Sequence, residues 1–321
     1  VCSSDLSNDK DIEMEEYESD SNVRSIITFS MLLQHTLRIY LIEKEKKDID
    51  RVLDKELLAI FDTFFFCDSD NEKDVKYFIE LLWEVRYMFD KYIIKWVETE
   101  DGEVHLINQL YLAKNEKTGS KSLVRKEPET NEGVALLQSM LYHSQQLTTH
   151  YWLTPYLHYL YINGMNNFNH QEDIDYSELN EGYGVEFSHY WFYKLEFVLW
   201  YLLKDKKDRR WKEFRFTAKN SVEHISPQHP KEEDRNKVSK DILDTFGNTS
   251  LVSRSINSEY SNLPYNEKRQ RFFNKNKEKL DSLKMDLIYE NEEWNDNLAI
   301  EHQKKMFEYL EEYFEREIMY E

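Results

Sequence analysis

Glycine and proline are scarce throughout this chain. Its 321 residues include only seven Gly and five Pro. Both residues mark turns, so their scarcity favours long helices with few hairpins. The core is expected to be aromatic, because the chain carries 22 Tyr, 18 Phe and seven Trp. We therefore predict a mainly α fold of about two domains, at roughly 150 residues each.

Apolar periodicity places the expected helices along the chain. Apolar residues that recur at intervals of three and four predict amphipathic helices. By this criterion helices are predicted at about 22–48, 49–66, 74–97, 132–150, 155–163, 187–205 and 294–320. The helix at 187–205 is strongly apolar, and we expect it in the core rather than as a base-stacking platform. Asp101-Gly102 is a turn signal whose flanks predict a short hairpin, and the polar stretch 113–131 predicts a loop.

The chain begins in an unusual way. It starts at Val1 without Met, and "VCSSDL" is what a common sequencing-library adapter encodes. We therefore expect residues 1–6 to be a read artefact and the protein to extend further upstream. The following residues are acidic and poor in apolar side chains, which predicts disorder. We therefore expect residues 1–21 to be an artefact followed by a disordered acidic leader.

Cysteine usage and hydropathy predict a cytoplasmic protein. Cys2 falls in the suspected artefact, and Cys67 alone makes no disulfide framework or zinc knuckle. The longest apolar run, Phe197 to Leu203, is far shorter than the roughly 20 residues that span a bilayer. No charged n-region with an apolar h-region opens the sequence, so we expect no secretory signal. We expect no membrane partner.

The net charge is −20, and an acidic chain does not attract nucleic acid through its overall field. The charge is uneven, however. Residues 204–219 hold eight Lys or Arg against three acids, and residues 268–279 hold six against one. Such runs are commonly solvated helix faces. These two bracket the polar motif described next, which makes them candidates for phosphate contacts.

The sequence changes character after Lys206. "KEFRFTAKNSVEHI" (212–225) and "FGNTSLVS" (246–253) are rich in β-formers, and "SINSEYSN" (255–262) predicts a helix with Ser255 as its N-cap. Glu223-His224 stands in the first segment, and Asn248 follows a glycine in the second. Asn257 stands nine residues beyond Asn248. A strand, a long loop, a second strand and a helix would bring these residues together.

Metal-assisted phosphodiester hydrolysis needs such a set of groups. A base with a pKa near neutrality has to deprotonate the attacking water, and histidine is the obvious candidate. A hard divalent cation neutralises the charge that develops on the phosphate. Carboxylate and Asn oxygens suit Mg²⁺, which keeps some of its waters and takes few protein ligands. His224 and Asn257 could supply the base and a metal ligand.

The order and spacing of these motifs resemble the His-Me finger (HNH-type) nucleases. More closely, the chain resembles the C-terminal nuclease domain and helical spacer of GmrSD-type modification-dependent restriction proteins. The resemblance rests on "SVEHISPQ" (221–228), "FGNTSLVSRSIN" (246–257) and "SNLPYNEKR" (261–269). It implies a helical spacer domain at 22–180 and an HNH-like nuclease domain at 181–321. A small ββα-metal (His-Me finger) core at about 213–275 would be embedded in helices, with a C-terminal helix at 294–320.

The resemblance also assigns roles to residues. His224 would be the general base, and Asn248 would complete the catalytic set by holding the second strand against the first loop. Asn257 and Glu223 would ligate one Mg²⁺ or Mn²⁺ ion. For each residue a structural alternative stays open: a partly buried histidine for His224, a helix cap for Asn257, and an ion pair with Arg215 or Lys219 for Glu223. Contacts to DNA phosphates are expected from Lys268, Arg269, Arg254 and Lys219.

Members of this family carry an N-terminal ParB-like half with a DGQQR-type motif that is linked to NTP hydrolysis. No such motif and no P-loop occur in these residues. We therefore expect a truncated gene, with any NTP dependence in the missing N-terminal domain. The expected partners are that domain, DNA and possible further copies of the chain. The chain is either a metal-dependent DNA endonuclease domain of a restriction system or an inactive nuclease-like scaffold of such a complex.

Overall fold

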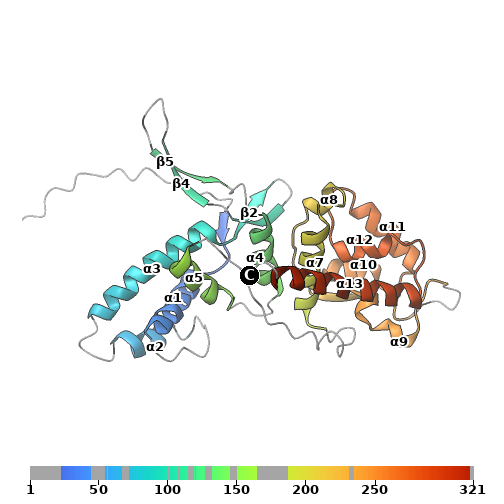
Figure 1. Cartoon of the computed structure of the whole chain (residues 1–321), viewed down its shortest axis with the longest axis horizontal. Helices are drawn as coiled ribbons and strands as arrows, with labels where there is room; N and C mark the ends of the chain where they lie inside the picture. Colours follow the sequence, from blue (N-terminus) through green and yellow to red (C-terminus); the bar gives the residue numbers. More distant parts are fainter. Residues whose placement is uncertain are drawn as a thin grey trace, which may run out of the picture.

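A computed structural model gives the fold (Figure 1), and the described part is mainly helical, as predicted. The structure describes residues 23–44, 55, 57–66, 72–99, 102–107, 109–114, 119, 121–126, 132–144, 150–164, 187–230 and 235–318. The leader at 1–21 lies outside these residues. Among them, no helix combines the length and apolar character needed to cross a membrane.

In the residues that the structure describes, the first half of the chain combines helices with two small sheets. Its helices are α1 (Phe29–Glu43), α2 (Leu57–Phe61), a π-helical turn (Asp62–Phe66), α3 (Glu72–Tyr92), α4 (Glu132–Ser144) and α5 (Leu153–Asn163). Its strands are β1 (Val23–Ser25), β2 (Lys95–Thr99), β3 (Gly102–Leu106), β4 (Gln109–Lys114) and β5 (Lys121–Lys126). The antiparallel order β1-β2-β3 forms one sheet, and β4-β5 forms a second.

The predicted hairpin is confirmed, and it is longer than expected. Strands β2 and β3 pair from Lys95 opposite Leu106 to Thr99 opposite Gly102. The helix predicted for 74–97 therefore ends early, at Tyr92. The Lys95 ammonium donates to the main-chain oxygens of Phe89 (3.2 Å), Asp90 (2.8 Å) and Ile93 (3.0 Å). It thus binds carbonyls at and just after the helix end, where the regular hydrogen bonds of the helix stop.

Two other sequence predictions for this half are corrected, and a third is confirmed over the residues that the structure describes. The loop predicted at 113–131 includes β5, which pairs with β4 through β-forming residues such as Tyr111 opposite Val124. The helix predicted from residue 22 begins at Phe29. Thr28 is its N-cap, and the Thr28 hydroxyl accepts from the Met31 amide (3.3 Å). The helix predicted at 49–66 is described only from Leu57, and it turns π-helical at Asp62.

The second half is built around one long apolar helix. Its helices are α7 (His189–Leu203), α8 (Arg209–Lys212), α9 (Lys240–Leu243), a 3₁₀ turn (Phe246–Asn248), α10 (Arg254–Tyr260), α11 (Tyr265–Lys275), α12 (Leu283–Tyr289) and α13 (Asp296–Ile318). Strands β6 (Ser221–His224) and β7 (Thr249–Val252) pair antiparallel. The first predicted strand is thus confined to 221–224. The N-cap of α10 is Ser253, which accepts from the Ile256 amide, and not Ser255.

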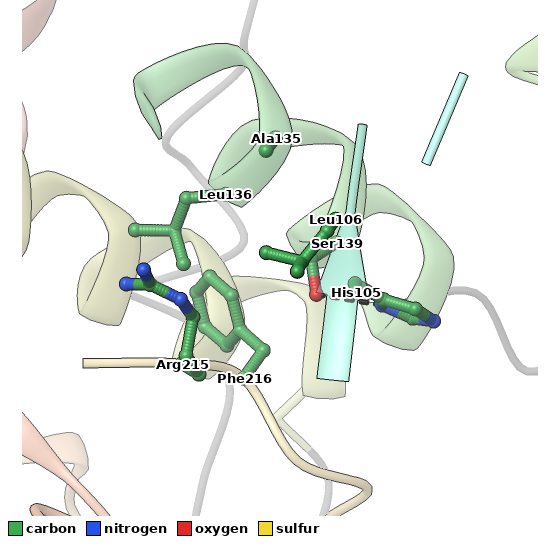
Figure 2. Close-up of a pocket in the computed structure, with 7 residues that line it drawn as sticks. All are labelled: His105, Leu106, Ala135, Leu136, Ser139, Arg215 and Phe216. Atoms are coloured by element: carbon green, nitrogen blue, oxygen red, sulfur yellow. Dashed lines mark hydrogen bonds between the residues drawn. The ribbon is translucent and has the colours of Figure 1, made fainter. Parts of the chain in front are cut away.

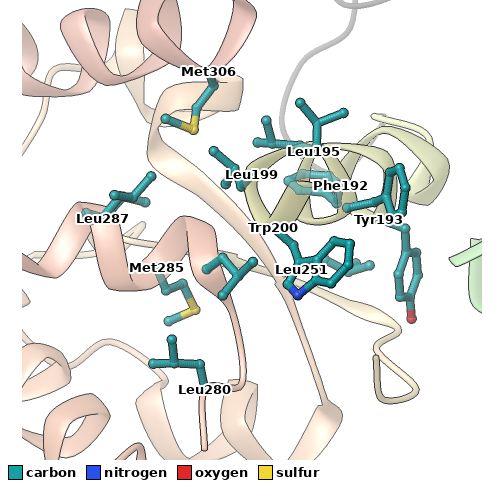
Figure 3. Packing of buried hydrophobic residues seen from close by; sticks show 14 of the residues in the cluster. Phe192, Tyr193, Leu195, Leu199, Trp200, Leu251, Leu280, Met285, Leu287 and Met306 are labelled. Atoms are coloured by element: carbon teal, nitrogen blue, oxygen red, sulfur yellow. The ribbon is translucent and has the colours of Figure 1, made fainter. Parts of the chain in front are cut away.

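Two hydrophobic clusters underlie the two halves. The larger one surrounds α7, whose side chains pack against β7, α12 and α13 (Figure 3). Trp200 is almost fully buried there, so the expectation that this helix is core is confirmed. The smaller cluster lies among α1, α3 and α5. Helix α4 contributes Leu136 and Met140 to the first cluster and Ala135 to the second, so it joins the two.

Histidines gather where the two halves meet. The rings of His105 and His143 lie 5.0 Å apart, and His143 stacks on Tyr193 of α7 at 5.9 Å. A small cavity of about 10 Å³ adjoins His105, between β3, α4 and the segment that carries Arg215 (Figure 2). Burial lowers the pKa of His105 to about 2, and it lowers those of His143 and His150 to about 4. The joint is therefore assembled with neutral imidazoles.

Candidate active site

The site is built on the two short strands β6 and β7. Glu223 lies opposite Ser250, and His224 lies opposite Thr249. Neighbouring residues in a strand point to opposite faces. His224 is the last residue of β6, however, and the chain turns directly after it. Both side chains can therefore reach the same cleft.

Asn248 holds the turn after β6 against the start of β7. Its carbonyl oxygen Oδ1 accepts from the Ser226 amide (3.0 Å) and from the indole of Trp294 (2.9 Å). Its Nδ2 donates to the Leu243 carbonyl (2.8 Å), and its main-chain oxygen accepts from the Ile225 amide (2.8 Å). Asn248 is completely buried. These bonds give it a structural position behind His224 rather than a place in the cleft.

A cleft of about 350 Å³ opens between β6, the turn that follows it and α10. His224 and Asn257 both line it, although they come from different elements. The remaining lining residues are Val222, Glu223, Pro227, Gln228, Ser258, Ser261 and Asn262. Residues with carboxylate, imidazole, amide and hydroxyl groups therefore line one space. Such a lining can bind polar groups, and it includes a candidate base.

His224 has a carboxylate partner that the sequence did not suggest. Its Nε2 lies 2.7 Å from Oδ1 of Asp244, which follows helix α9. The His224 side chain is only 8% exposed, whereas that of Asp244 is 51% exposed. The one sequence signal that could have pointed to Asp244 is its place in the loop between the strands, four residues before Asn248.

Glu223 pairs with Lys268, and not with Arg215 or Lys219. The Lys268 ammonium lies 2.6 Å from Glu223 Oε1, and it also donates to the His224 carbonyl oxygen at 2.7 Å. Burial raises the pKa of the Glu223 carboxyl, and the charge of Lys268 opposes that shift. Lys268 is completely buried. The expected contact between Lys268 and a phosphate is therefore corrected: the buried Lys268 side chain holds strand β6 in place through its bonds to Glu223 and His224.

Comparison with known proteins gives one match to this part of the chain. Residues 172–309 match the family model described as GmrSD restriction endonucleases, C-terminal domain. This part of the chain is therefore similar to that domain family. The resemblance stated from the sequence is thereby confirmed for the part of the chain that carries β6, β7 and the cleft. No curated protein and no solved structure matches the chain.

The structure separates the four residues from which phosphate contacts are expected. Lys219 is buried and donates to the main-chain oxygen of Asp281, so it does not face solvent. Arg269 is half-buried, donates to the Tyr289 carbonyl (2.7 Å) and lies over the ring of Phe273. Only Arg254, at the first position of α10, is exposed. Burial therefore removes Lys219 and Lys268 as phosphate ligands, and Arg269 is engaged within the fold.

The donors in the cleft fit a divalent cation that keeps most of its waters. Within the ranges that the structure describes, no three His, Cys, Asp or Glu side chains gather to hold a metal. Mg²⁺ and Mn²⁺ accept carboxylate and amide oxygens and often need few of them. Glu223 and Asn257 both line the one cleft, and the buried Lys268 ammonium already binds the Glu223 carboxylate. Substrate oxygens would have to complete such a site.

Proposed function

We propose that the chain carries a metal-dependent DNA endonuclease domain of a restriction or phage-defence protein. One observation supports this above all: His224 and Asn257, from β6 and α10, line the same cleft in the part of the chain that is similar to the GmrSD C-terminal domain family. A base and an oxygen ligand at one cleft are what hydrolysis of a phosphodiester requires.

In the proposed reaction His224 takes the proton from the attacking water. Asn257 and Glu223 would hold one Mg²⁺ or Mn²⁺ ion, which when bound neutralises charge on the phosphate and on the leaving oxygen. Arg254, exposed at the start of α10, would contact the DNA backbone. Asn248 keeps the turn after His224 in place. These assignments give each polar residue of the motif a separate task.

The wider assembly is proposed on the family relationship. GmrSD-type restriction would combine this domain with an N-terminal NTPase domain, and the DNA that it cleaves could be modified or come from phage. Copies of the chain could associate as well. A cytoplasmic location is consistent with a nuclease that acts on entering DNA.

A second candidate function, an inactive nuclease-like scaffold, has one observation in its favour. Lys268 already occupies Glu223 in a buried ion pair, which leaves fewer free carboxylate oxygens for a metal. The two functions differ in a simple assay. The chain is incubated with supercoiled plasmid in Mg²⁺, in Mn²⁺ and in EDTA. An endonuclease nicks or linearises the plasmid only with metal, whereas a scaffold leaves it supercoiled under all three conditions.

A further inference from the structure

The contact between His224 and Asp244 has a consequence for the proposed base. Asp244 touches His224 but does not line the cleft. His224 therefore stands between a carboxylate and the space where a substrate would lie. The geometry points to Asp244 as a positioning residue that orients the His224 imidazole and fixes its proton on Nε2, which leaves Nδ1 as the basic nitrogen. This role of Asp244 rests on the proposed function.

The chemistry of the two groups sets the direction of the hydrogen bond. An ionised carboxylate can only accept, so the Nε2 atom that faces Asp244 has to carry a proton. A neutral imidazole with its proton on Nε2 keeps a lone pair on Nδ1. The 2.7 Å separation between Nε2 and Oδ1 is typical of a hydrogen bond strengthened by charge. Nδ1 is then the atom that can take a proton from water.

The backbone around Asp244 is fixed on both sides, which supports a defined position for its carboxylate. Before it, the Leu243 carbonyl accepts from Asn248 Nδ2 (2.8 Å). After it, the Thr245 hydroxyl donates to the Ile242 carbonyl (2.8 Å). The same Asn248 side chain also binds Ser226, two residues beyond His224. Asn248 therefore ties the segment of Asp244 to the segment of His224.

The competing explanation is an ordinary surface ion pair. The Asp244 side chain is half-exposed, and exposed pairs contribute little to stability. The two explanations differ in what Asp244 changes. Loss of a surface pair would leave the turnover rate unaffected, whereas loss of a positioning residue would lower it.

The kinetic test measures plasmid cleavage by the wild-type chain and by three variants. The test variants are Asp244→Ala and Asp244→Asn, and the control is Asp241→Asn. Asp241 is exposed on α9, three residues earlier, and serves as the matched control. We expect Asp244→Ala to lower kcat on the order of 10²-fold with little change in KM, because general-base catalysis contributes about 10²–10⁴-fold. Asp244→Asn, which keeps an acceptor oxygen, should retain more activity than Asp244→Ala. Asp241→Asn should match the wild type.

A second readout needs no activity. The ¹⁵N resonances of the His224 ring at about pH 8, where an ordinary histidine is neutral, report which nitrogen carries the proton. We expect the Nε2-protonated form in the wild type and a mixture of tautomers in Asp244→Ala. A proton on Nδ1 in the wild type, or unchanged spectra in Asp244→Ala, overturns the role of Asp244.

The proposed function and the role of Asp244 can fail separately. If His224→Ala abolishes cleavage while Asp244→Ala keeps the wild-type kcat, the role of Asp244 is wrong and the proposed function stands. If His224→Ala cleaves as well as the wild type, the proposed function fails. The tautomer measurement then decides separately whether Asp244 fixes the imidazole proton.

Discussion

Lys268 and Glu223 form an ion pair of 2.6 Å in which the lysine side chain is completely buried and the glutamate is only 5% exposed. The lysine also holds the carbonyl of His224. One buried cation therefore fixes both the side chain and the main chain of the Glu-His motif. The pair stabilises the strand that carries the proposed base.

Removal of Lys268 should destabilise the protein strongly. Lys268→Met leaves Glu223 as an uncompensated buried charge, for which we expect a loss of about 3–5 kcal/mol in the free energy of unfolding. Urea denaturation measures it. The double variant Glu223→Gln/Lys268→Met should recover part of that loss, since no charge is then stranded. A double variant no more stable than Lys268→Met would contradict this explanation.

Gly247 is required by close packing rather than by its backbone freedom. A Cβ atom at this position would lie 2.2 Å from the Ala299 carbonyl oxygen on α13. Gly247→Ala should therefore cost at least about 1–3 kcal/mol of stability, as expected for overpacking. Gly133→Ala is the matched control, because its Cβ would meet Trp200 at an ordinary 3.8 Å. That variant should be neutral or up to about 1 kcal/mol more stable in thermal unfolding.

Acid should weaken the joint between the two halves. His143 and His150 have pKa values of about 4 when folded, below the ordinary 6.5. Below about pH 6.5 the unfolded chain therefore binds more protons than the folded one, and stability falls as the pH drops towards about 4. Each such histidine adds a slope of at most about 1.4 kcal/mol per pH unit.

The variant His143→Phe tests this acid dependence. Phenylalanine keeps a ring that can stack on Tyr193 but removes one group that binds a proton on unfolding. Urea denaturation at about pH 5 and pH 7 should show a smaller loss of stability than in the wild type. His229→Gln is the control, because His229 is exposed in the folded chain. Equal acid sensitivity in His143→Phe and the wild type would refute the claim that His143 contributes to the loss of stability in acid.

Asn257 should affect metal use more than folding. It is half-buried and lines the cleft. If Asn257 is a metal ligand, Asn257→Ala should raise the Mg²⁺ concentration that gives half-maximal cleavage by at least about 10-fold. The midpoint of thermal unfolding should change little. Asn262→Ala, an exposed asparagine of the same cleft, is the control. Equal metal dependence in both variants would contradict Asn257 as a metal ligand, and a cap is no alternative because Asn257 lies inside α10, whose N-cap is Ser253.

The sequence predicted much of the second half because its signals are local. The apolar helix at 189–203, the paired strands at 221–224 and 249–252, and the last helix all follow from periodicity and β-forming residues. The loop predicted at 113–131 was wrong, because polar positions in β5 obscured its pairing with β4. Pairing between strands depends on a partner that a single segment does not reveal.

The partners of the motif residues could not be predicted in the same way. Lys268 lies 45 positions after Glu223, and Asp244 lies 20 positions after His224. Neither contact follows from periodicity, since both depend on how α9 and α11 pack on the strands. The positive charge at 268–279 suggested phosphate contacts, yet Lys268 turns inward. Charge in a sequence does not reveal which side chains face solvent.

Single-turnover cleavage of supercoiled plasmid by wild type and His224→Ala tests the central claim most directly. With Mg²⁺ or Mn²⁺ the wild type should produce nicked or linear DNA. His224→Ala, if its circular dichroism and thermal unfolding match the wild type, should be slower by about 10²–10⁴-fold, which is the usual contribution of a general base. Metal-dependent cleavage by a folded His224→Ala protein at the wild-type rate would contradict the assignment of His224 as the base.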